Sequence, residues 1–91
     1  MTADFKIDNN ALASRFELHA SGGLAMLDYR IESDTVFLLH VEVPAPNQGR
    51  GIAGKLSQAA LEFARDNGLK VVASCPYIAT YMRQHPELLD R

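Results

Sequence analysis

The 91-residue sequence contains little that would place it outside a reducing, aqueous compartment. It has one cysteine, Cys75, so a disulfide within the chain is impossible, and this cysteine usage favours a reducing environment. No apolar run approaches the roughly 20 residues of a membrane-spanning helix. The N-terminus also lacks the apolar stretch of a signal peptide. We therefore expect a cytoplasmic protein with no membrane partner.

Basic residues do not cluster. Nine lysines and arginines against eleven acidic residues give a net charge of −2, and the cations are scattered along the chain. A nucleic-acid groove needs a clustered basic face, so the charge pattern argues against a nucleic-acid partner. The sequence has no internal repeat, low-complexity tract or linker, which predicts a single domain over residues 1–91. These features leave the oligomeric state open.

The first half of the chain predicts an antiparallel meander. After a short edge strand at 5–7, alternating polar and apolar residues indicate strands at 15–20, 25–31 and 35–43. Turn residues separate these strands. In the last strand, strict alternation predicts that one face carries Val36, Leu38, His40 and Glu42, and the other Phe37, Leu39, Val41 and Val43.

The second half predicts helices around one further strand. Apolar residues at helical spacing indicate a helix over 51–67, followed by a strand at 69–74 and a short helix at 77–84. Because a helix separates them, the strands at 35–43 and 69–74 are expected to be parallel, with a right-handed crossover. The predicted class is α+β, of the α/β sandwich type.

A glycine-rich stretch connects the last meander strand to the following helix. Residues 44–55 read Pro-Ala-Pro-Asn-Gln-Gly-Arg-Gly-Ile-Ala-Gly-Lys, with Gly49, Gly51 and Gly54 around the cation Arg50. Glycines let a backbone approach a ligand closely. The unpaired N–H groups and the dipole of a helix N-terminus favour phosphate. The stretch therefore predicts a phosphate-binding site.

Three phosphate-binding motifs partly match this stretch. A triphosphate loop needs Ser or Thr after its lysine to hold Mg²⁺, but Leu56 follows Lys55. A dinucleotide fingerprint needs an acidic residue near the end of the next strand, and that strand ends Ala-Ser-Cys at Cys75. The acyl-coenzyme A signature Q/R-x-x-G-x-G/A is matched by residues 48–53, Gln-Gly-Arg-Gly-Ile-Ala.

Residues 43–53 resemble the coenzyme A-binding segment of the GNAT superfamily of N-acetyltransferases. The flanking segments 40–44 (His-Val-Glu-Val-Pro), 74–77 (Ser-Cys-Pro-Tyr) and 85–87 (His-Pro-Glu) are similar to its small, single-domain YjdJ-type (NATD1-like) branch. The resemblance covers about residues 25–89. It implies a minimal GNAT fold, with an antiparallel meander leading into a parallel strand–helix–strand unit and a short C-terminal helix.

The resemblance also implies which residues hold the cofactor. In these proteins the strand before the signature diverges from the next parallel strand, and the pantetheine arm of acetyl-coenzyme A occupies the gap. The signature backbone holds the pyrophosphate. Carried over to this sequence, the cofactor-binding residues are Val41, Val43, Gln48, Gly49, Arg50, Gly51, Ile52, Ala53 and Gly54.

The transfer of acetyl to an amine needs a base and a proton for the leaving thiolate. His40 and Glu42 lie on one strand face, and His40 is preferred as the base because an imidazole titrates near neutral pH. Cys75 could act as an acid, as an acyl-accepting nucleophile or as a buried wall residue. Tyr81 matches the tyrosine that protonates the leaving sulfur in many GNAT enzymes, and Tyr77 is the alternative.

The predicted function is an acetyl-coenzyme A-dependent N-acetyltransferase. It would transfer the acetyl group directly to a primary amine, such as a lysine side chain or a polyamine. The alternative is a non-catalytic acyl-coenzyme A-binding module that acts through a protein partner. The histidines and the cysteine lack the spacing of a zinc site, so no metal is expected.

Overall fold

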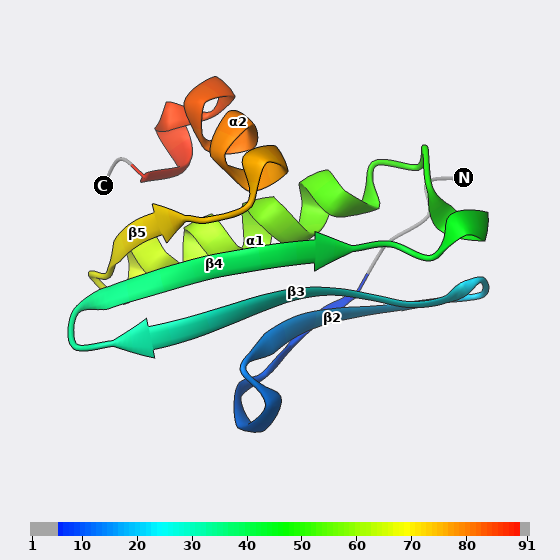
Figure 1. The fold of residues 1–91 in the computed structure, drawn as a ribbon, viewed down its shortest axis with the longest axis horizontal. Helices are drawn as coiled ribbons and strands as arrows, with labels where there is room; N and C mark the ends of the chain where they lie inside the picture. Colours follow the sequence, from blue (N-terminus) through cyan, green and yellow to red (C-terminus); the bar gives the residue numbers. More distant parts are fainter. Residues whose placement is uncertain (1–5, 90–91) are drawn as a thin grey trace.

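Five strands form one mixed sheet in the computed structural model, which describes residues 6–89 (Figure 1). The strands lie in sequence order, β1-β2-β3-β4-β5. The pairs β1–β2, β2–β3 and β3–β4 are antiparallel, and β4–β5 is parallel. The bounds are β1 (Ile7–Asn10), β2 (Arg15–Ala20), β3 (Gly23–Glu32), β4 (Thr35–Glu42) and β5 (Lys70–Ala73).

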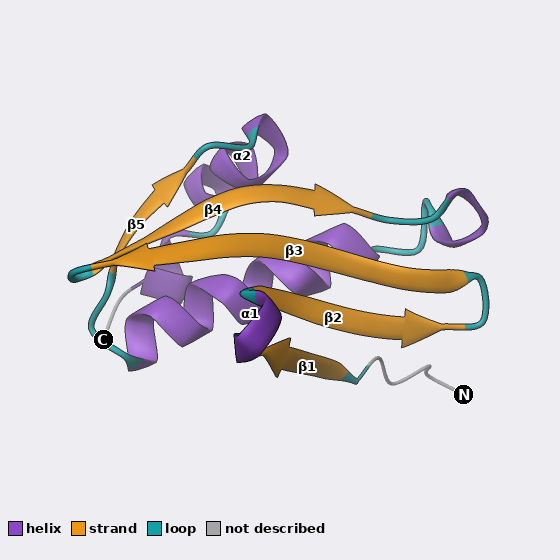
Figure 2. Ribbon diagram, turned by 60° about the horizontal axis from the view of Figure 1, so that its bottom comes forward, coloured by secondary structure: helices purple, strands orange, loops and turns teal. Residues whose placement is uncertain are grey.

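Two helices accompany the sheet. Helix α1 (Ile52–Asp66) connects β4 to β5 and packs along one face, where it contacts β2, β3, β4 and β5 (Figure 2). Helix α2 (Pro76–Gln84) contacts α1, β4 and β5. Short 3-10 turns cover Ala11–Ala13, Ala45–Asn47 and Pro86–Leu89. Within residues 6–89, neither helix has the length and apolarity needed to cross a bilayer.

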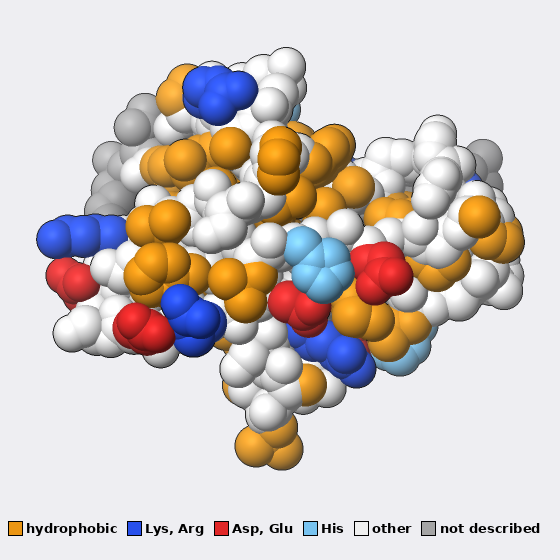
Figure 3. All heavy atoms as spheres, viewed as in Figure 1, with side chains coloured by type: hydrophobic (Ala, Val, Ile, Leu, Met, Phe, Trp, Pro, Cys, Tyr) orange, Lys and Arg blue, Asp and Glu red, His pale blue; other side chains and the backbone are white. Residues whose placement is uncertain are grey.

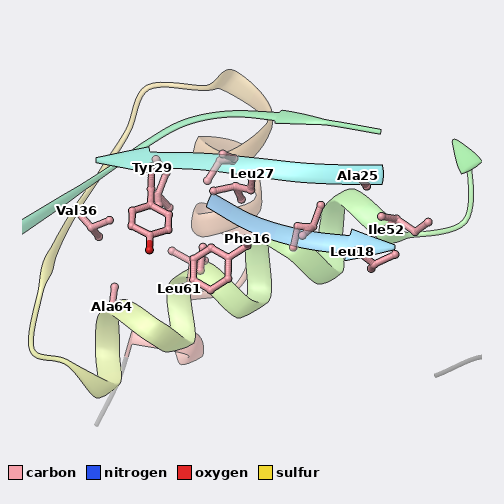
Figure 4. Packing of buried hydrophobic residues seen from close by; sticks show 13 residues of the cluster. Phe16, Leu18, Ala25, Leu27, Tyr29, Val36, Ile52, Leu61 and Ala64 are labelled. Atoms are coloured by element: carbon pink, nitrogen blue, oxygen red, sulfur yellow. The ribbon is translucent and has the colours of Figure 1, made fainter. Parts of the chain in front are cut away.

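The core lies between α1 and the sheet. In Figure 4, Phe16 and Tyr29 point from the strands toward the part of α1 that carries Leu61, and Leu18 lies near Ile52 at the start of that helix. Each large apolar side chain buried in this way stabilises the fold by about 1.5–3 kcal/mol. Large apolar side chains that are fully buried come from every layer: Leu18, Leu27, Val36 and Leu38 from the strands, Ile52, Leu56 and Leu61 from α1, and Ile78 from α2.

An aromatic cluster joins α1 to the antiparallel strands. The ring centroids of Phe16 and Tyr29 lie 5.3 Å apart, and Phe63 of α1 lies 5.6 Å from Phe16 and 5.9 Å from Tyr29. The Tyr29 hydroxyl donates a hydrogen bond to Asn9 Oδ1 at 2.7 Å, which links β3 to the edge strand β1. The cluster therefore fixes the position of α1 across the meander.

The α+β class and the order of the elements predicted from the sequence are confirmed. The helix predicted over 51–67 spans Ile52–Asp66, and the side chain of Asn67 donates to the Phe63 carbonyl at its end. A short edge strand is observed at Ile7–Asn10, which shares only Ile7 with the strand predicted at 5–7; residue 5 lies outside the described part. Pairing with β2 determines where this strand forms, because its two asparagines have little intrinsic preference for β structure.

A β-bulge in β4 overturns the predicted alternation of that strand. Asp28 lies opposite His40 and Tyr29 lies opposite Leu38, which leaves Leu39 as the extra residue. One extra residue exchanges the two faces of a strand from that point onward. His40 and Glu42 therefore lie on the face opposite α1, with Asp28, whereas Val36 and Leu38 are buried beneath α1.

Two leucines test the packing of this core with the same chemical change. Leu61 is 0% exposed and Leu12, on the first 3-10 turn, is 102% exposed. We expect Leu61→Ala to lower the free energy of unfolding by about 2–5 kcal/mol through lost burial and a cavity. Leu12→Ala should change it by less than about 0.5 kcal/mol. Urea denaturation measures both, and similar losses in the two variants would contradict the described core.

Candidate functional site

The two parallel strands stay paired over only part of β4. Pairing runs from Thr35 opposite Lys70 to Leu38 opposite Ala73, and the Ser74 N–H donates to the Leu38 carbonyl at 2.9 Å. Strand β4 continues to Glu42. Residues 39–42 thus extend beyond the last β5 pair, and the side of β4 that would face β5 is open there.

A hollow of about 240 Å³ lies at this open end. It is formed by the end of β4, the following loop, the first turn of α1 and one side chain of α2. Its lining residues are Val43, Asn47, Gln48, Gly49, Gly51, Ile52, Ala53 and Tyr77.

The glycine backbone of the loop suits close approach by a ligand. Gly49 has φ +81° and Gly51 has φ +77°, a conformation that L side chains rarely adopt. A Cβ added to either glycine would meet no heavy atom of the described chain within 4 Å. The loop therefore leaves open space directly above its backbone.

The start of α1 provides backbone donors. The Lys55 N–H donates to the Gly51 carbonyl at 3.1 Å, so the helical hydrogen-bond ladder begins there. The N–H groups of residues 52–54 precede that first bond, and the side chain of the capping residue, Gly51, is only a hydrogen atom. Together with the helix dipole, donors of this kind favour an anion at a helix N-terminus.

Three polar side chains brace the loop. Gln48 Nε2 donates to the Val43 carbonyl at 3.1 Å, and Arg50 Nη1 donates to Asn47 Oδ1 at 3.3 Å. Asn47 is 1% exposed, and a Cβ on Gly22 of the β2–β3 turn would lie 2.6 Å from its Oδ1. Asn47 is not among the predicted site residues, because nothing in the local sequence pattern distinguishes it from an ordinary turn asparagine.

His40 stands between two carboxylates on the sheet face opposite α1. Its Nδ1 lies 3.3 Å from Asp28 Oδ2, and its Nε2 lies 3.8 Å from Glu42 Oε1. Figure 3 shows histidine and acidic side chains gathered in the middle of this face. Asp28 is not among the predicted site residues, because it comes beside His40 through a bulge that the sequence pattern does not reveal.

The tyrosines of α2 form a stack that begins at the hollow. The Tyr77 ring lines the hollow and stacks on Tyr81 with centroids 6.5 Å apart. Tyr81 also stacks on His85 at 4.1 Å and lies outside the lining. A Cβ on Gly54 would lie 3.4 Å from the Tyr81 ring, so this glycine permits α1 and α2 to approach each other.

The structure brings most of the predicted cofactor residues to one place. Three of the predicted cofactor residues do not line the hollow. Arg50 lies in the loop, Gly54 in the first turn of α1, and Val41 in β4. Cys75 follows β5 at the start of α2 and packs partly buried against the core. Among residues 6–89, no group of three or more His, Cys, Asp and Glu is arranged to hold a metal ion. The predicted residues that line the hollow are Val43, Gln48, Gly49, Gly51, Ile52 and Ala53.

Comparison with known proteins identifies relatives over nearly the whole chain. The family model described as GCN5-related N-acetyl-transferase matches residues 15–91. Protein NATD1 of Xenopus tropicalis is 32% identical over 88 residues, which cover 93% of this chain and 81% of that protein. Protein NATD1 of Danio rerio is 32% identical over 91 residues, with 94% and 83% covered.

A solved structure supports the fold. The solution structure of a GCN5-like protein from Staphylococcus aureus matches with a TM-score of 0.68 and covers 98% of this chain and 88% of its own. The two sequences are 24% identical. The arrangement of the mixed sheet and its two helices is therefore shared with that protein.

The environment of Tyr81 predicts a pH dependence of stability. Burial, with smaller contributions from Tyr77, Glu87 and Glu62, raises the pKa of Tyr81 above its ordinary value of 10.0. The folded protein holds this proton more tightly than the unfolded chain. The resulting stabilisation is complete below pH 10.0 and is lost as pH rises through the folded pKa.

We therefore expect the free energy of unfolding of the wild type, relative to Tyr81→Phe, to be constant below pH 10.0 and to decrease above it. Urea denaturation of both proteins across this range measures the difference. A difference that stays flat, or that rises with pH, would contradict the buried position of Tyr81.

Proposed function

The chain belongs to the GCN5-related N-acetyltransferase family, and on that premise we propose that it binds acetyl-coenzyme A and transfers the acetyl group to a primary amine. The observation that carries the proposal is the coincidence of two features. The β4–β5 pairing ends at Leu38 and Ala73, and the glycine loop with its open backbone lies at that same end of the sheet.

The residues present suit the cofactor. The backbone of Gly49–Ala53 would hold the pyrophosphate, because its positive-φ glycines leave space for close approach and its N–H groups precede the helical ladder. The open side of β4 from residue 39 to Val43 would hold the pantetheine arm by backbone hydrogen bonds. When bound, the coenzyme supplies a thioester, which is an acetyl donor with a thiolate leaving group.

Acetyl transfer requires an uncharged amine, so a protonated acceptor must lose a proton. His40 is the proposed base, since it lies on the exposed face beyond the bulge, three residues before Val43 at the hollow. The carboxylates of Asp28 and Glu42 beside it favour a cationic acceptor. A lysine side chain or a polyamine carries the positive charge that would complement these carboxylates.

A tyrosine of α2 is the proposed proton donor to the leaving thiolate. Tyr77 lines the hollow, whereas Tyr81 lies behind it in the stack. The structure therefore favours Tyr77 over the initial candidate Tyr81. We rank direct transfer above a covalent intermediate on Cys75, because its side chain packs against the core.

The second candidate is a non-catalytic acyl-coenzyme A-binding module. One observation favours it: in the described part of the chain, the sheet face that carries His40 has no helix over β2 and β3 (Figure 1). The acceptor side is therefore an open surface. We propose a cytoplasmic location for either function, on the basis of the unpaired thiol of Cys75.

Two glycines with matched strain test the binding site. Gly51 has φ +77° at the hollow, and Gly68 has φ +66° after the far end of α1. A valine at either position is forced into the left-handed region, at a cost of about 1–2 kcal/mol. Acetyl-coenzyme A should raise the melting temperature of the wild type and Gly68→Val by mass action, but not that of Gly51→Val.

Differential scanning fluorimetry with millimolar acetyl-coenzyme A measures this effect. No shift in the wild type would contradict both candidate functions. Equal shifts in the two variants would show that the ligand does not contact the loop.

His40→Ala tests catalysis separately from binding. We expect the amine-dependent release of free coenzyme A thiol to fall about a hundredfold or more, since general bases typically contribute that much. The thermal shift by acetyl-coenzyme A should be retained. His19→Ala is the matched control, because His19 lies on β2 and contacts Glu17 at 3.6 Å. Equal rates in the wild type and His40→Ala would remove His40 from the mechanism, and no turnover by the wild type across an amine panel would favour the binding module.

A further inference from the structure

We propose that Asp28 is a positioning residue that fixes the imidazole of His40. Its carboxylate would hold the Nδ1 proton, so that the Nε2 lone pair remains available on the side of Glu42. The catalytic consequence rests on the proposed function, but the imidazole orientation is a property of the free protein and can be measured there.

The fold places these two side chains against each other. Asp28 and His40 are direct cross-strand partners in β3 and β4, and their facing atoms lie 3.3 Å apart. Directly opposite residues of an antiparallel pair have Cβ atoms about 4.5–5.5 Å apart, close enough for their side chains to interact. The bulge at Leu39 is necessary, because without it His40 would fall on the face beneath α1.

Neighbouring cations do not compete for Asp28. Arg15 lies opposite Asp28 on β2, but its Nε donates to Glu17 at 2.7 Å, and this bond lowers the pKa of Glu17. Arg30, two residues further along β3, pairs with Glu32 at 2.7 Å. Among the described residues, the Asp28 carboxylate pairs with His40.

The two carboxylates beside His40 differ in a way that assigns different roles. Asp28 is 31% exposed in its side chain and Glu42 is 67% exposed. Solvent screens the Asp28 contact less, so it restrains the ring more strongly. Glu42 Oε1 lies 3.8 Å from Nε2, too far for a hydrogen bond. A cationic amine could therefore approach Nε2 beside Glu42, while Asp28 holds the opposite nitrogen.

A neutral imidazole carries its proton on one nitrogen, and the partner of that nitrogen selects the tautomer. An acceptor-only carboxylate at Nδ1 favours the Nδ1–H form. That form leaves Nε2 as the proton acceptor. Replacing Asp28 should therefore change the tautomer of His40 without removing either of its ring nitrogens.

The direct test is the ring ¹⁵N NMR spectrum of His40 in the free protein, at a pH above the ordinary titration range of imidazole. We expect the Nδ1–H tautomer to dominate in the wild type, in Asp28→Glu and in the control Glu32→Ala. It should lose its dominance in Asp28→Ala. An Nε2–H tautomer in the wild type, or an unchanged spectrum in Asp28→Ala, would overturn the proposal whether or not the protein turns over.

A double-mutant cycle of Asp28→Ala and His40→Ala, followed by steady-state kinetics, is the second test. Asp28→Ala should lower kcat for amine-dependent thiol release about tenfold to a hundredfold, by analogy with the loss of a partner that orients a metal-bound histidine. KM for acetyl-coenzyme A should stay within about twofold, and Asp28→Glu should restore most of the rate. In the His40→Ala background, Asp28→Ala should have no further effect.

Independent, multiplicative losses in the double variant would overturn the role through His40. A wild type that shows the Nδ1–H tautomer but no turnover would contradict the proposed enzyme, and the positioning of His40 by Asp28 would stand.

Discussion

The extra residue Leu39 in β4 determines the geometry on which the candidate site depends. Before it, Val36 and Leu38 are buried beneath α1, and Leu38 forms the last pair with β5. After it, the strand faces are exchanged, and β4 extends beyond β5 toward the loop. The one-residue insertion thus brings His40 and Glu42 to the exposed face. One side of β4 is open beyond Leu38 because the pairing with β5 ends there. β-Bulges often re-aim side chains in this way next to functional sites.

The conformation of the loop after β4 depends in turn on contacts with the end of that strand and with the β2–β3 turn. Gln48 donates to the Val43 carbonyl, and the buried Asn47 fills the space above Gly22 and accepts from Arg50. These contacts hold Gly49 and Gly51 in left-handed conformations that only glycine adopts at little cost. The first turn of α1 then begins with free backbone donors facing a hollow. The proposed binding of a phosphate-bearing ligand there would rest on backbone geometry, with little dependence on charged side chains.

Local patterns in the sequence predict the fold and the position of the glycine loop between β4 and α1. The apolar spacing of α1, the prolines after β4 and the glycines of residues 49–54 each act within a few residues, so their consequences can be predicted locally. The bulge cannot be predicted in this way, because a one-residue phase change alters no residue type and appears only in the pairing with β3. Asp28 is missed for the same reason. The local pattern also does not show that a side chain at Gly54 would meet the Tyr81 ring, because this depends on how α2 packs against α1.

Backbone ¹H–¹⁵N NMR spectra recorded during a titration with acetyl-coenzyme A test whether the coenzyme binds along the open side of β4 and over the glycine loop. We expect the largest chemical-shift changes on the amides of residues 39–43 and 48–54. Another hollow, lined in part by Arg65, Lys70 and Met82 at the other end of α1, should show little change. Changes centred on that other hollow, or no changes at millimolar ligand, would contradict binding at the glycine loop.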